Sequence, residues 1–171
     1  SNADRMHVKS PMLSIDTPIG TSSEFEGSFV LDSMSGASPL YLDTVSGASG
    51  IGVEDRRKAA DAKFTQYFEE FSLGIGGVFS NENDYDSRGL TLESEIWTAS
   101  KNTSFTFAVS GNQDEITSDI DPQLDEDRRT FSFLTGISQV LNSRSRIQAN
   151  LTLSSGDGYF SDPYKNYDNR P

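Results

Sequence analysis

Residues 103–111 read TSFTFAVSG, and this stretch decides the fold class. Phe105, Phe107 and Val109 alternate with serine, threonine and alanine, so a strand here is apolar on one face and small and polar on the other. Four other stretches repeat this period of two, namely residues 72–80, 89–99, 129–141 and 145–154. Together the five stretches predict an antiparallel up-and-down β-meander.

The N-terminal part adds further strands. Residues 24–33 predict one strand, and residues 5–15 predict another in which Pro11 has to lie at an edge or a bulge. Residues 34–52 are rich in glycine, serine and alanine and predict a long loop. Residues 53–71 fit either a helix or a strand by their spacing, and the hairpin partner that follows favours the strand. The fold class is therefore all-β, with about seven or eight strands.

The connections between these strands alternate in length. Those at residues 69–72, 100–102 and 142–144 are predicted to be tight, whereas those at residues 81–88, 112–128 and 156–171 are longer and acidic. Strict alternation places all the long loops at one end of the sheet, as in barrels of the outer membrane.

The two strand faces favour a membrane barrel over a soluble β-domain. Phenylalanine, leucine and isoleucine dominate one face, while glycine, serine, threonine and alanine dominate the other, and small polar side chains suit a narrow barrel interior. Ser94 and Thr135 interrupt the apolar face. A few larger polar side chains are predicted to face the lumen: Glu93, Glu95, Arg146, Gln148 and Asn150. Charges there need partners, so Glu93 and Glu95 are expected to pair with Arg146 or Lys63.

Aromatic residues lie near the predicted strand ends. Interfacial aromatic girdles are typical of membrane barrels, although burial at hairpin ends explains the same positions equally well. The residues concerned are Tyr67, Phe68, Phe71, Trp97, Tyr159 and Phe160.

The composition excludes several classes of function. A net charge of −12 argues against nucleic acid as a partner, because phosphate-binding surfaces need clustered lysine and arginine. The chain has no cysteine, and its one histidine, His7, has no accompanying nucleophile motif. We therefore expect no catalytic residues, no enzymatic activity and no bound cofactor.

One acidic loop is a weak candidate for a metal site. Its carboxylates supply the oxygen ligands that Ca²⁺ prefers, but their spacing does not match an EF-hand. The candidates are Asp119, Asp121, Asp125 and Asp127, with Glu126 beside them. A second cluster, formed by Asp157, Asp162 and Asp168, is similarly weak. A solvated acidic loop is the simpler interpretation of both.

Several short segments resemble a known family. They are Val53-Glu54-Asp55-Arg56-Arg57, the hairpin at residues 67–79, the stretch GYFSDPY at residues 158–164 and DNRP at residues 168–171; SGASP at residues 35–39 also fits. The chain resembles a bacterial family of uncharacterised proteins predicted to lie in the outer membrane. The resemblance implies a longer barrel protein with no assigned catalytic residues.

These observations lead to one set of expectations. Residues 1–3 are interpreted as a scar of tag removal, and residues 4–171 as a single β-domain cut from a longer barrel. We expect an outer-membrane β-barrel protein of structural or passive-transport type, with lipid as its partner. Open sheet edges are sticky, so the fragment is expected to self-associate through them. The alternative is a soluble exported β-domain that binds a ligand or calcium through acidic loops.

Overall fold

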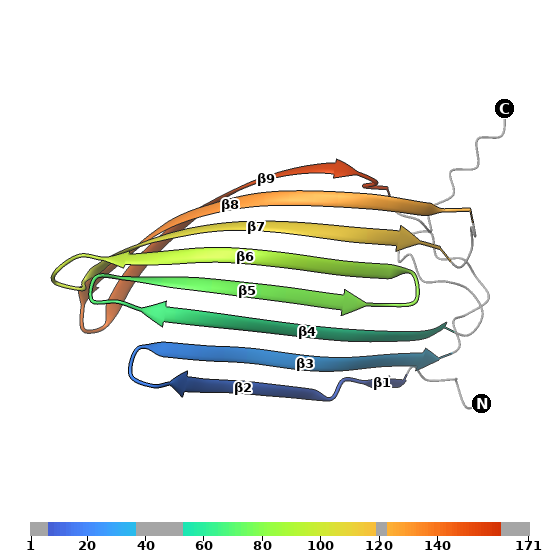
Figure 1. Ribbon diagram of the computed structural model, residues 1–171, viewed down its shortest axis with the longest axis horizontal. Coiled ribbons are helices and arrows are strands. Elements are labelled where there is room, and N and C mark those ends of the chain that lie inside the picture. The colour runs from blue at the N-terminus through green and yellow to red at the C-terminus, as the bar shows by residue number, and fades with distance from the viewer. Residues whose placement is uncertain (1–6, 37–52, 119–122, 162–171) are drawn as a thin grey trace.

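The computed structural model describes residues 7–36, 53–118 and 123–161, and this part of the chain is a single antiparallel sheet (Figure 1). Each strand pairs with its neighbour in sequence, except that both β1 and β2 pair with β3. The nine strands are β1 His7–Lys9, β2 Met12–Ile19, β3 Ser23–Gly36, β4 Val53–Tyr67, β5 Phe71–Asn81, β6 Tyr85–Trp97, β7 Thr103–Thr117, β8 Asp125–Asn142 and β9 Ser145–Gly158. The all-β meander predicted from the sequence is confirmed.

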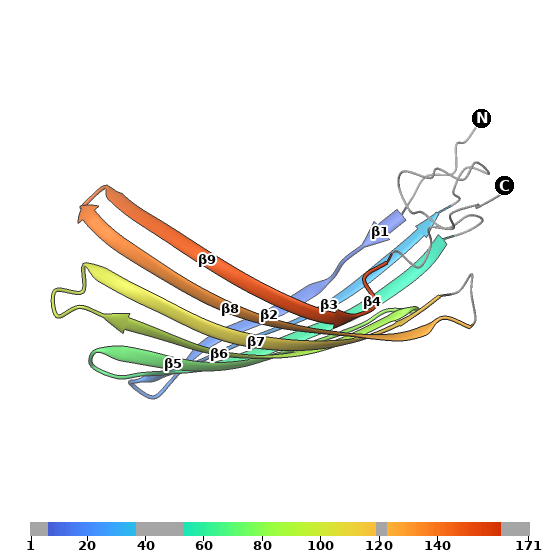
Figure 2. The same cartoon turned by 90° about the horizontal axis from the view of Figure 1, so that it is seen from above.

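The sheet is one layer and does not close. Within the described residues, β9 pairs only with β8, and β1 and β2 pair only with β3. Seen from above, β9 and β1 run in clearly different directions, so the layer is strongly twisted and curved (Figure 2). Because the sheet is curved, side chains on its inner side are brought closer together than those on its outer side.

The ambiguous segment is a strand. β4 pairs with β3 along one edge and with β5 along the other, and this double pairing overrides its local helix propensity. In this register Phe64 lies directly between Phe25 and Ile75, which places the phenylalanines of β3, β4 and β5 on one face. The sheet, and not local preference, therefore sets the conformation of this segment.

The first predicted strand, residues 5–15, is in fact divided. Pro11 lies between β1 and β2, at the edge of the sheet, where its missing N–H removes no pairing. Its carbonyl oxygen still accepts a hydrogen bond from the Leu31 amide, at 3.1 Å. This division explains why the sheet has nine strands and not seven or eight, while β2 itself extends further, to Ile19.

Two of the predicted long loops are wrong. The connection predicted at residues 81–88 spans only the residues between Asn81 and Tyr85, and that at residues 112–128 spans only those between Thr117 and Asp125. The acidic residues continue the ladders instead: Asp86 pairs with Asn81, and Asp114 with Arg128. Cross-strand partners for the charges allow these hairpins to extend. The tight connections are confirmed, and strict alternation of short and long loops is not.

Candidate functional site

The register divides the side chains into two faces that span the whole sheet. The apolar face carries a continuous band of large side chains: Leu13, Ile15, Phe25, Phe29, Phe64, Leu73, Ile75, Phe79, Leu90, Leu92, Ile96, Phe105, Phe107, Val109, Phe131, Phe133, Ile137, Leu151 and Leu153. The polar face carries small side chains opposite them, among them Ser72, Gly74, Thr91, Thr106, Ala108, Ser110, Ser132 and Ser154. Ser94 and Thr135 do interrupt the apolar band, as their positions predict.

Exposure is the reverse of that in a water-soluble domain. Phe105, Phe131 and Leu151 are 39%, 57% and 56% exposed, and no layer covers them in the described part of the chain. Ile116 is the one buried large apolar side chain among the described residues. The buried strand residues Thr65, Ser72 and Asp114 all belong to the polar face. The polar side chains therefore pack closely against one another, whereas the apolar side chains are exposed and uncovered.

Glycines make room for this crowding on the polar face. Glu93 lies over Gly74, its direct partner in the ladder: a Cβ at Gly74 would come within 2.7 Å of Glu93 Cγ. In the same way Asn112 lies over its partner Gly89, and Asn150 over Gly136. Each of these polar side chains thus lies over a glycine of the neighbouring strand, where no side chain occupies the space.

One ion-pair cluster uses this arrangement. The Lys63 ammonium lies 2.6 Å from Glu93 Oε1 and 3.3 Å from Glu26 Oε2. Lys63 belongs to β4 and Glu93 to β6, so their contact crosses β5 above Gly74. Of the two partners expected for Glu93, the structure has Lys63; Arg146 lies on β9, which has no contact with β6.

A second cluster lies beyond the apolar band, where the strands extend. Arg128 donates to Asp114 Oδ2 through Nε at 2.8 Å, and its Nη2 lies 2.7 Å from the same oxygen. Ser87 donates to Asp114 Oδ1 at 2.6 Å. Burial would raise the pKa of Asp114, but the hydrogen bonds from Ser87 and Arg128 outweigh it and lower that pKa. Arg128 also donates to the Tyr85 hydroxyl at 3.0 Å. The cluster fastens β6, β7 and β8 together through a fully paired carboxylate.

The residues predicted to face a lumen all lie on the polar face. Glu93 pairs with Ala108 and Glu95 with Thr106, while Arg146, Gln148 and Asn150 follow along β9 opposite Val140, Ser138 and Gly136. Gln148 donates weakly to Asn150, at 3.4 Å. Their common face is established by the register, whereas an enclosed lumen remains a prediction.

The predicted metal ligands are only partly placed. Asp119 and Asp121 lie outside the described residues, as do Asp162 and Asp168 of the second acidic cluster. Asp125, Asp127 and Asp157 are exposed on strands β8 and β9. No group of three potential ligands comes together in the described part of the chain, and calcium binding remains a prediction. The side chain of His7 also lies outside the description.

The predicted girdle residues lie at both ends of the sheet. Tyr67, Phe68, Phe71 and Trp97 gather at the end with the tight turns, where the Phe68 and Phe71 rings stack at 4.5 Å. Tyr159 and Phe160 follow β9 at the opposite end. The positions fit interfacial aromatic residues, but half-exposed rings at hairpin ends fit equally well.

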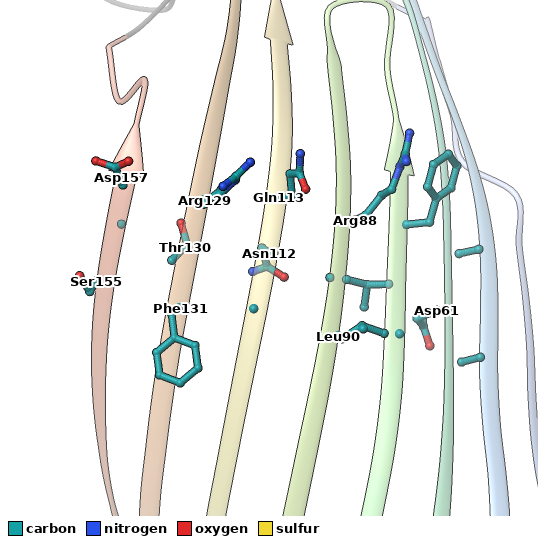
Figure 3. A pocket seen from close by; sticks show the side chains of 18 residues that line it. Asp61, Arg88, Leu90, Asn112, Gln113, Arg129, Thr130, Phe131, Ser155 and Asp157 are labelled. Carbon is teal, nitrogen blue, oxygen red and sulfur yellow. The ribbon is translucent and has the colours of Figure 1, made fainter.

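A shallow hollow of about 940 Å³ on the apolar face has no counterpart among the sequence predictions. Leu90 and Phe131 lie in it, and Arg88, Gln113, Arg129 and Asp157 form a row across four strands at its polar boundary (Figure 3). The signal in the sequence is glycine at positions 77 and 111, where the apolar alternation calls for a large side chain.

Comparison with known proteins identifies a family. Residues 44–125 and 117–168 match the model of a protein family of unknown function, DUF3570. The chain belongs to the DUF3570 family. No curated protein and no solved structure matches it. Among the described residues of this DUF3570 protein, no helix is long and apolar enough to cross a membrane.

Proposed function

We propose that the chain forms part of the wall of an outer-membrane β-barrel, of structural or passive-transport type. The observation that carries the proposal is the reversed exposure: a continuous band of phenylalanine, leucine and isoleucine stands uncovered while serine, threonine and glycine crowd the other face. In water this arrangement is unfavourable, because large exposed apolar patches promote association. In a bilayer the same arrangement is stable, since lipid covers the apolar face.

The dimensions of the apolar band support this proposal. The band extends from Leu90 to Ile96 on β6 and from Phe71 to Phe79 on β5, which is roughly 20 to 26 Å along the strands. An outer-membrane barrel has an apolar band about 25 Å tall, before strand tilt is counted. Polar side chains bound the band on the same face, with Arg88 and Arg129 level with Phe79 at one end and Thr103 and Gln139 at the other.

The polar face supports a role that is not catalytic. Several of its larger side chains are engaged in ion pairs and hydrogen bonds, such as Lys63 with Glu93 and Arg128 with Asp114. Such paired charges hold neighbouring strands together and set the polarity of a solute path. The proposal assigns no enzymatic step and no cofactor to the chain.

Single cysteines test the proposal directly, because the chain has none of its own. We expect spin labels at residues 104–109, in the chain reconstituted in phosphatidylcholine vesicles, to alternate in accessibility. Labels at Phe105, Phe107 and Val109 should collide with oxygen dissolved in lipid, and labels at Ser104, Thr106 and Ala108 with a water-soluble nickel complex. Uniform access to the nickel complex would reject membrane insertion and favour the alternative, a soluble exported β-domain.

The proposal also covers partners at the sheet edges. β9 is an exposed edge strand along its whole length, whereas the opposite edge carries Pro11 and Pro18. Proline and short strands protect an edge, so we propose that association of this chain with a second copy uses β9. Light scattering that finds only monomers in detergent would overturn this part.

A further inference from the structure

The hollow on the apolar face is shaped by missing side chains. In the ladder Gly77 pairs with Leu90, and Leu90 pairs with Gly111, so two glycines flank one leucine. Leu90 is consequently 68% exposed, and among the large apolar side chains that the structure describes only Leu13 has a higher value. A Cβ at Gly111 would meet nothing within 4 Å, which confirms that the space beside Leu90 is open. Ala60 and Ala62 continue the low floor towards β4.

Two arginines lie in the polar row at the rim of the hollow. Arg88, Gln113 and Arg129 are direct ladder partners on β6, β7 and β8, one row beyond Leu90, Gly111 and Phe131 on the same face. All three are exposed, and neither arginine has an ion-pair partner in the part of the chain that the structure describes. Two unpaired guanidinium groups with an amide between them offer several N–H donors to one anion.

Carboxylates limit where that anion can lie. Asp86, Glu115 and Asp127 form the next row outward on the same face, and Asp157 lies beside Arg129 on β9. Their charges repel an anion from the outer row and from the edge strand. An anion at this rim would therefore be favoured at Arg88 and Gln113 and on the near side of Arg129, next to the apolar hollow.

We propose that this hollow binds a single anionic phospholipid, with its acyl chains against Leu90, Gly111 and Phe131 and its phosphate at Arg88 and Arg129. The site suits an amphipathic ligand, because its apolar floor is open to hydrocarbon and two arginines lie at the level where the apolar band ends. The inference rests on the proposed function, because a lipid reaches this face only if the face borders the bilayer.

The test titrates the chain, extracted from vesicles into a mild non-ionic detergent, with phosphatidylglycerol or phosphatidylcholine and counts bound lipid by native mass spectrometry. We expect Arg88→Gln combined with Arg129→Gln to weaken phosphatidylglycerol binding about thirtyfold, since each basic side chain at an anionic lipid surface is worth about fivefold. Binding of phosphatidylcholine should weaken much less, because its choline cation offsets the charge of its phosphate. The matched control, Arg144→Gln with Arg146→Gln, removes the same charge at the β8–β9 turn and should leave both lipids unaffected.

A second variant tests the floor of the hollow. Gly111→Leu fills open space and should weaken binding of both lipids at least fivefold, while its circular dichroism spectrum stays that of the parent sheet. If phosphatidylglycerol binds the double arginine variant as tightly as the parent, the lipid site is overturned while alternating spin-label accessibility still upholds the barrel. If the spin labels show no contact with lipid on either face, both the proposed function and the lipid site are rejected.

Discussion

The two faces of this sheet are built from the same strands, residue by residue, yet they obey opposite rules. On the polar face Thr65, Ser72 and Asp114 are buried, whereas Leu92 on the apolar face is 55% exposed. This difference between the faces shows that backbone ladders and polar contacts hold the strands together. The apolar side chains of the sheet are not buried within it.

The largest expected effect comes from a charge placed on one face or on the other. We expect Leu92→Arg to destabilise the vesicle-inserted chain by about 2–4 kcal/mol, because it puts a cation near the middle of the apolar band. Thr91→Arg, one residue away on the polar face, should change stability by well under half of that amount, since Glu93 lies nearby on the same face. Urea titration of the chain in vesicles measures both, and equal losses would erase the distinction between the faces.

A smaller effect is expected from the buried carboxylate of the polar face. Asp114→Asn should lower the free energy of unfolding by about 2–3 kcal/mol at neutral pH. This loss is smaller than that from breaking a fully buried ion pair, because the Arg128 side chain is 28% exposed. Chemical denaturation measures the loss, and Asp157→Asn, an exposed residue on β9, is the control. No loss on Asp114→Asn would show that the cluster does not fasten the strands.

The same carboxylate predicts a dependence on pH. The folded pKa of Asp114 is lowered below the value of 3.8 that an unperturbed aspartate has. Its stabilising contribution is therefore fully present above pH 3.8 and is lost as the pH falls through the folded pKa. Denaturation measured between pH 6 and pH 2.5 should show a step in the parent below pH 3.8 that is smaller in Asp114→Asn. Identical profiles for the two proteins would contradict the paired carboxylate.

The smallest effect contrasts two glycines. Gly74→Ala should destabilise by about 1 kcal/mol, because the added Cβ displaces Glu93 from its position beside Lys63. Gly111→Ala, on the open apolar face, should stabilise by about 0.4–1 kcal/mol, since the methyl group meets nothing and the unfolded chain loses freedom. Thermal unfolding of both variants in the same detergent measures the two changes in stability. A change of the same sign in both variants would contradict the contrast between the two glycines.

Much of the polar network is not visible in the sequence. The alternation places Glu93 and Glu95 on the correct face, but Lys63 and Arg146 are equal candidates as partners as long as the strand order is unknown. The local pattern assigns Asp114 to an acidic loop, since nothing nearby in the chain shows that Arg128 lies opposite it. The arginine row at the hollow escapes prediction for the same reason: Arg88 and Arg129 are far apart in the chain and meet only through the register.

The sequence by itself determined that the chain forms strands with one apolar and one small polar face, because side-chain alternation with a period of two is a local property of an extended backbone. Only the tertiary structure decided that β4 is a strand, that the acidic segments continue the ladders, and which charges pair across β5 and between β7 and β8. These outcomes depend on which strands are neighbours and in which register, and both are set by contacts between residues distant in sequence.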